Sequence, residues 1–234
     1  MAPTKQAETQ PVRVYLEQTE RRTFAVAVDW PGWARAGRTP EAALDALAEY
    51  LPRYLAVVRA AGRRIPGTGS GGPEFSVVER VPGNATTTFG APGVVPALDA
   101  ARWSAETADQ QAALVAACWQ HLDAVAATAP AQLRKGPRGG GRDRDTIVRH
   151  VLDAEVAYAR KIGLRVPAPG DPAQQDAFRA DLLTTLHRSA LPDTPWVPDT
   201  ARAKGWPAAY ASRRIGWHAL DHAWEIQDRS DPPG

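Results

Sequence analysis

The sequence predicts an α+β protein of two domains: a small β-β-α-β unit over residues 12–81, then an all-α four-helix bundle over residues 95–230. Three observations support this fold class. The β-rich segments flank a single helical pattern in the first part of the chain. A stretch rich in Gly and Pro follows at residues 82–96 and reads as a linker. Four long segments with apolar stripes then complete the chain.

The first domain is predicted from two strands, a helix and a third strand. In chain order they cover residues 12–20, 23–29, 39–62 and 75–81. Arg21 and Arg22 make a short turn between the first two strands, which therefore form a hairpin. Thr39 is a favourable N-cap, and Pro40 after it suits the first helical position. This unit has room for little more than one helix packed on one face of a sheet.

The second domain is predicted from four helices. They cover residues 104–128, 145–162, 171–191 and 207–229. Ser104 opens the first of them as an N-cap, and Asp171 followed by proline opens the third. A proline-rich connection over residues 192–206 leads into the fourth. Helices of similar length with apolar stripes bury those stripes against one another, so a bundle is expected.

Composition excludes several classes of protein. The formal net charge of +2 gives no electrostatic case for nucleic acid or an anionic membrane. The N-terminus lacks the apolar core of a signal peptide, and no apolar run is long enough to span a bilayer. The single cysteine, Cys118, excludes an intrachain disulfide and a cysteine-based zinc site. A cytoplasmic location is the resulting expectation.

The candidate site begins with His218 and His222, four residues apart in the last predicted helix. This spacing puts both imidazoles on one helix face, where two neutral rings can chelate one metal ion. The alternative for such a pair is plain packing or an exposed helix face. His150 in the second predicted helix shares a face with Ala154 and Ala157, which leave space beside it. Three neutral histidines with an open position form a catalytic pattern, and the alternative for His150 is an ordinary core histidine.

Other polar residues fall on inward faces of the predicted helices. His121 is a candidate second-shell residue, substrate contact or extra ligand, or else a core histidine bonded to a neighbour. Arg214 and Glu225 flank the histidine pair, and a carboxylate there could orient an imidazole; a surface ion pair is the alternative. The basic glycine-rich segment over residues 134–144 either binds an anion at the start of a helix or is a solvated loop.

The helical part resembles the DinB/YfiT-like superfamily over about residues 95–230. The resemblance rests on His150 in a His-x-x-x-x-Glu pattern and on Trp217-His218-x-x-x-His222 in the last helix. It implies a four-helix bundle holding a divalent metal, zinc or nickel, with His150, His218 and His222 as ligands. It further implies a transferase or isomerase that uses a low-molecular-weight thiol and a small-molecule substrate. A metal-dependent hydrolase is the variant of this function.

The first domain resembles the HicB-like family over about residues 12–81. The resemblance rests on Asp29-Trp30-Pro31-Gly32 and on Gly37-Arg38-Thr39-Pro40-Glu41-Ala42-Ala43. It implies a domain that binds a protein partner, as in antitoxins. A metal-binding regulatory or partner-binding protein is therefore the alternative function. A homodimer formed through this domain is a further expectation.

Overall fold

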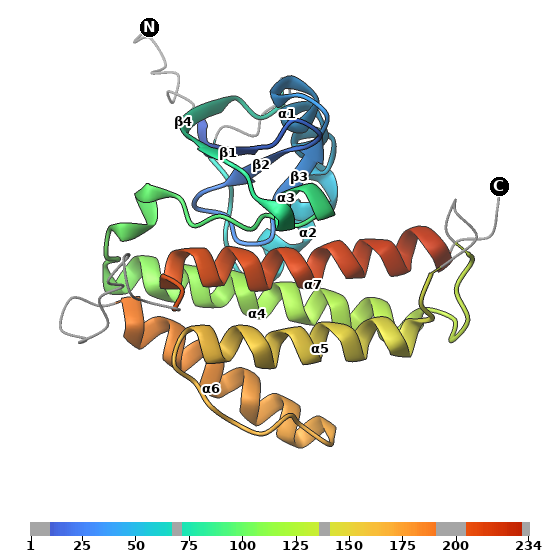
Figure 1. Ribbon diagram of the computed structural model, residues 1–234. Coiled ribbons are helices and arrows are strands. Elements are labelled where there is room, and N and C mark those ends of the chain that lie inside the picture. The colour runs from blue at the N-terminus through green and yellow to red at the C-terminus, as the bar shows by residue number, and fades with distance from the viewer. Residues whose placement is uncertain (1–9, 67–71, 136–140, 191–204, 231–234) are drawn as a thin grey trace, which may run out of the picture. The chain divides into compact units, whose positions relative to one another are not determined.

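A small mixed sheet near the N-terminus, followed mostly by helices, makes this an α+β protein (Figure 1). The computed structural model describes residues 10–66, 72–135, 141–190 and 205–230. By internal contacts the chain divides into two compact units. The first comprises Met1–Asp29 and Trp33–Pro96, and the second comprises Trp30–Gly32 and Ala97–Gly234. No helix of the described residues is both long and apolar enough to cross a membrane.

The first unit is built on a sheet whose strands lie in the order β3-β2-β1-β4. Its elements are β1 (Val12–Gln18), β2 (Thr23–Ala27), β3 (Ala34–Gly37), α1 (Pro40–Glu49), α2 (Leu51–Ala60), β4 (Phe75–Pro82) and α3 (Ala85–Phe89). β1 and β2 form the predicted antiparallel hairpin, with Tyr15 opposite Val26. β4 pairs with β1 in parallel, with Val14 opposite Val77. Parallel pairing needs a long crossover, which the two intervening helices supply.

The β-β-α-β order predicted for this unit is wrong in two places. The predicted helix is two helices, since α1 ends at Glu49 and α2 begins at Leu51. Pro52 explains the break, because a proline has no amide hydrogen and its ring clashes with the preceding turn. The strand β3 was not predicted at all. The N-cap at Thr39 is confirmed, because its side chain accepts a hydrogen bond from the Ala42 amide.

Buried polar atoms tie the connections of this unit to its core. The Trp33 side chain is fully buried, donates from Nε1 to the Leu47 carbonyl over 2.8 Å, and stacks on Tyr54 with ring centroids 5.4 Å apart. The Glu17 carboxylate on β1 is also buried and accepts the Gly93 amide over 2.8 Å. Because buried polar groups must be paired, these bonds hold the segments around β3 and after α3 in place.

The second unit contains the predicted long helices. Its elements are the short 3₁₀ helix η1 (Ala97–Ala100), α4 (Ala105–Thr128), α5 (Arg144–Lys161), α6 (Pro172–Ala190) and α7 (Ala208–Ser230). The boundaries follow the predicted caps: Ser104 accepts the Thr107 amide, and Asp171 accepts the Gln174 amide. α7 packs against both α4 and α5, and α5 runs in the opposite direction to both (Figure 1). This arrangement places a face of α5 against the face of α7 that carries the histidine pair.

A buried ion pair fastens η1 to α7. Asp99 on η1 meets Arg213 on α7, and their side chains are 0% and 4% exposed. Burying two charges costs several kcal/mol for each ion unless they meet in good geometry. The pair therefore links η1 to α7 at the turn just before His218.

A second buried charge lies among α4, α5 and α6. The Glu155 carboxylate of α5 is fully buried, and neither of its oxygens has a hydrogen-bond partner among the described residues. The Nε of Arg179 on α6 lies 3.6 Å from Glu155 Oε2. Burial raises the pKa of Glu155 to about 7, although the Arg179 charge works against this shift.

This raised pKa predicts a stability that falls as pH rises. Below about 7 the folded chain holds a proton on Glu155, whereas the unfolded carboxyl releases it near 4.5. The folded state thus binds more protons between these values, and stability declines through that window, by on the order of 3 kcal/mol. Urea unfolding from pH 4.5 to 8 should show this decline relative to Glu155→Gln. A difference between the two proteins that does not change with pH would contradict it.

Candidate metal centre

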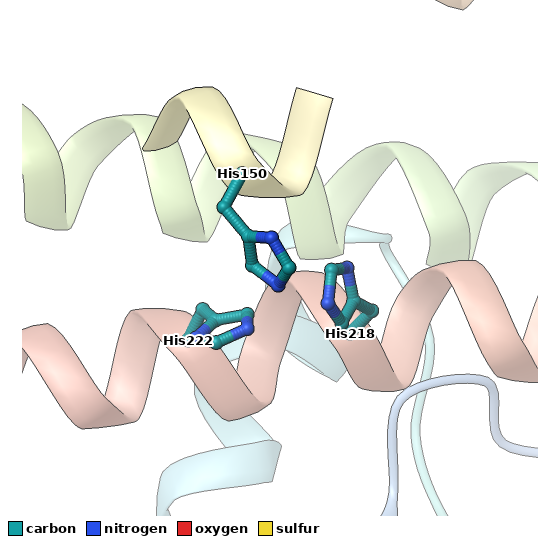
Figure 2. Close-up of side chains that lie close together, drawn as sticks. All are labelled: His150, His218 and His222. Atoms are coloured by element: carbon teal, nitrogen blue, oxygen red, sulfur yellow. The ribbon is translucent and has the colours of Figure 1, made fainter. Parts of the chain in front are cut away.

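Three histidines from two helices converge in the second unit (Figure 2). His150 projects from α5, and His218 and His222 project from α7, one turn apart. The ring centroid of His150 lies 5.1 Å from that of His218 and 5.0 Å from that of His222, and the two α7 rings are 4.7 Å apart. One ring nitrogen of each lies within 4.8 Å of the others, so all three can reach a common point.

The surroundings of His218 and His150 favour the neutral form of these two imidazoles. His218 is 6% exposed, and burial lowers its pKa to about 2, with His222 and Arg214 adding to the shift. Burial also lowers the pKa of the half-buried His150, with a further contribution from Arg142. A neutral imidazole has a lone pair to donate. At neutral pH, therefore, neither His218 nor His150 has to lose a proton before it binds a metal.

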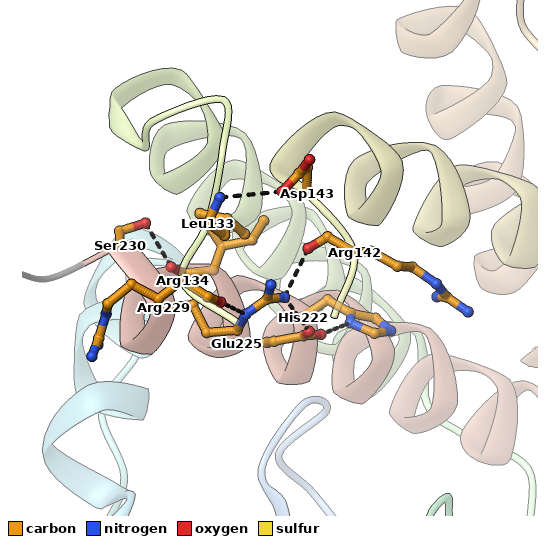
Figure 3. Close-up of polar contacts among 9 residues, drawn as sticks. Leu133, Arg134, Arg142, Asp143, His222, Glu225, Arg229 and Ser230 are labelled. Atoms are coloured by element: carbon orange, nitrogen blue, oxygen red, sulfur yellow. Dashed lines mark hydrogen bonds and ion pairs between the residues drawn. The ribbon is translucent and has the colours of Figure 1, made fainter. Parts of the chain in front are cut away.

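Glu225 orients His222 (Figure 3). Its Oε2 lies 2.8 Å from His222 Nδ1, and this bond is the main cause that lowers the pKa of Glu225. A carboxylate can only accept, so the hydrogen of His222 sits on Nδ1 and the lone pair on Nε2. The carboxylate is held in turn by Arg229, whose guanidinium donates to Glu225 Oε1 over 2.9 Å. Such a carboxylate–histidine pair is the usual support of a metal-binding imidazole.

Arg229 also bonds to two described residues between α4 and α5. It donates to the carbonyl of Arg134 over 2.7 Å and to that of Arg142 over 2.8 Å, and these two residues stand on either side of residues 136–140 (Figure 3). Within the predicted basic segment 134–144, residues 136–140 lie outside the described part. Arg229 was not among the predicted site residues, although its position seven residues after His222 puts it on the same helix face.

The other predicted site residues differ in how they lie relative to the three histidines. Glu225 contacts His222, as described above, whereas Arg214 lies over the rings of Tyr158 and Trp217. His121 is half-buried on α4 and is not a member of the three-histidine group. The prediction that Ala157 faces the interior beside His150 is wrong, since Ala157 is exposed. Ala154, one turn after His150, is half-buried.

Two aromatic rings, those of Tyr158 and Trp217, lie beside His218, and the contact of Tyr158 was not predicted. Tyr158 of α5 lies 5.7 Å from the His218 ring, and Trp217 lies 6.0 Å from it, centroid to centroid. Trp206, just before α7, packs on Tyr158 at 5.0 Å and on Tyr210 at 4.9 Å. Tyr158 lies eight residues after His150 and therefore about 80° from it around the helix, so helical spacing gave no direct signal for this contact.

The donor set fits a borderline transition metal such as zinc or nickel. Such ions favour neutral imidazole ligands. The Nδ1 of His218 is buried without a hydrogen-bond partner among the described residues, so this nitrogen is open to a ligand. His222 presents Nε2 because Glu225 occupies its Nδ1.

No family model, curated protein or solved structure matched the chain in the comparisons made.

Proposed function

We propose that this protein is a divalent-metal-dependent enzyme whose metal, zinc or nickel, is held by His150, His218 and His222. The observation that carries the proposal is the convergence of three imidazoles within 4.8 Å of one another. Three protein ligands leave coordination positions for a substrate, as in catalytic zinc sites. The proposal places α4 to α7 in the four-helix-bundle class of the DinB/YfiT-like superfamily.

The proposed reaction is the transfer of a group to a low-molecular-weight thiol, or a thiol-dependent isomerisation. A bound divalent cation would supply Lewis acidity, which lowers the pKa of a thiol or water. His150 and the α7 pair would fix the position of the ion, and Glu225 would keep Nε2 of His222 directed at it. The half-buried state of His150 and His222 leaves the centre accessible to small molecules.

Thiol consumption tests this function. The protein, loaded with Zn²⁺ or Ni²⁺, is incubated with bacillithiol, mycothiol or glutathione and a chlorodinitrobenzene electrophile, and loss of free thiol is followed. We expect metal-dependent turnover with at least one thiol and none after chelation. Turnover of an activated ester without thiol would favour the hydrolase instead. Stoichiometric metal with neither activity would argue against an enzyme of this kind.

The second candidate is a partner-binding protein that uses the first unit. The strand β4 lies at the edge of the sheet and exposes Val77 and Val78, at 36% and 44%. An open strand edge with exposed apolar side chains is a surface on which another chain can add a strand. This candidate gains support if the thiol and ester assays are both negative while a protein co-purifies with the chain from its native host.

A further inference from the structure

We propose that Glu155, Arg179 and Asp123 form a proton-controlled switch among α5, α6 and α4. Loss of the Glu155 proton moves the Arg179 guanidinium from Asp123 to Glu155. None of these residues belongs to the three-histidine group, so the switch goes beyond the proposed function and can fail without affecting it. It is carried by the hydrogen bonds that these groups make and lack.

The observed arrangement is that of a protonated Glu155. Its side chain is fully buried, and neither carboxyl oxygen has a hydrogen-bond partner among the described residues. A buried carboxylate without hydrogen bonds is strongly disfavoured relative to the neutral acid. Arg179 meanwhile donates from Nη1 to Asp123 Oδ2 over 2.7 Å. The cation is therefore bound to the acid that is 49% exposed, and the buried acid carries the proton.

Two buried donors are in place for the ionised form of Glu155. The Nε of Arg179 lies 3.6 Å from Glu155 Oε2, and the Nε1 of Trp119 on α4 lies close by, since its N–H and the Arg179 charge both lower the pKa of Glu155 against the burial that raises it. Neither nitrogen has a partner among the described residues. Because buried donors without an acceptor are costly, an ionised Glu155 would satisfy both of them.

The switch changes which helix the Arg179 cation links to α6. In the observed state its short hydrogen bond runs to Asp123 on α4, and in the ionised state it would run to Glu155 on α5. The largest charge effects on Glu155 come from Arg179 on α6 and Asp123 on α4, and no described residue of α7 is among them. The competition between one cation and two acids therefore governs the exchange.

Nuclear magnetic resonance of the full chain between about pH 5.5 and 8.5 tests the switch. The readouts are the carboxyl ¹³C signal of Glu155, the indole N–H of Trp119 and the Nε–H of Arg179. We expect the three signals to move together, with one midpoint near 7. In Glu155→Gln, which keeps the shape of the protonated side chain, the Trp119 and Arg179 signals should stay in place. Trp119→Phe and Arg179→Lys assign them.

Two charge variants test the competition for the cation. Arg179→Gln should raise the Glu155 midpoint by about one to three pH units, because a nearby opposite charge favours the ionised form. Asp123→Asn should lower it by about one unit, since it removes a like charge and releases the guanidinium. Asp181→Asn is the matched control, because it removes an exposed acid from α6 two residues after Arg179. We expect it to shift the midpoint by less than about 0.3 units.

Each other outcome overturns the switch. A Glu155 carboxyl that keeps one protonation state over the whole range excludes it. Titration of Glu155 without movement of the Arg179 and Trp119 signals leaves a buried acid that controls nothing. Equal movement of those signals in Glu155→Gln assigns them to the histidines. If Asp123→Asn shifts the midpoint no more than Asp181→Asn does, Asp123 does not compete for Arg179. This last comparison also decides if Glu155→Gln does not fold by circular dichroism.

Discussion

Replacing His218 with alanine is expected to abolish stoichiometric binding of Zn²⁺ or Ni²⁺. His218 is the most buried of the three imidazoles, and its loss leaves two ligands that come from different helices. Loss of a residue that only supports a ligand typically weakens a metal site about 10- to 100-fold, and loss of a ligand should cost more than that. Competition with a chromophoric chelator, together with elemental analysis, measures the effect.

Two further variants make this a graded series. Glu225→Gln keeps His222 and removes the charge that orients it, so we expect a loss of about 10- to 100-fold. His187→Ala removes a histidine of α6 that pairs with Asp109 outside the group, and it should bind metal like the wild type. Stoichiometric metal in His218→Ala at wild-type affinity would refute the three-histidine site.

Breaking the buried ion pair of the second unit is expected to have the largest effect on stability. Arg213→Met leaves the Asp99 carboxylate buried without the cation that now meets it. Removing one partner of a buried pair typically costs about 3–5 kcal/mol. Urea unfolding followed by circular dichroism, which reports mainly on the helices, measures this loss.

A double substitution and an exposed pair serve as controls. Asp99→Ala combined with Arg213→Met removes both charges, so its cost should be clearly smaller than the sum of the single losses. The pair of Arg149 and Asp153 is 56% exposed on both sides, and breaking it should cost about 0.5 kcal/mol. Equal effects for the buried and the exposed pair would show that burial does not govern the Asp99–Arg213 contact.

The helices of the second unit could be predicted because their signals are local. Ser104 and Asp171 cap them, and prolines mark their starts. The short strand β3 could not, because Ala34–Gly37 lacks the β-branched and aromatic residues typical of strands and forms only by pairing with β2. The break between α1 and α2 had a signal in Pro52, which the continuous apolar stripe concealed.

In the candidate site, too, some contacts could be predicted from local spacing and others could not. The contacts of Glu225 with His222 and Arg229 lie within one helix, so spacing alone could predict them. The position of Arg214 over Tyr158 depends on how α5 and α7 are rotated against each other. That rotation is set by packing over the whole length of both helices, and no local pattern records it.

The three histidines come from helices that are about 70 residues apart in the chain. An unfolded chain keeps only the local pair on α7, so a metal that needs all three rings binds the folded unit preferentially. By mass action, free metal at about 100 times its dissociation constant would add roughly 2.7 kcal/mol to the folding free energy. The melting temperature of the protein would then follow the supply of metal in its surroundings, so metal availability would set the stability of the fold.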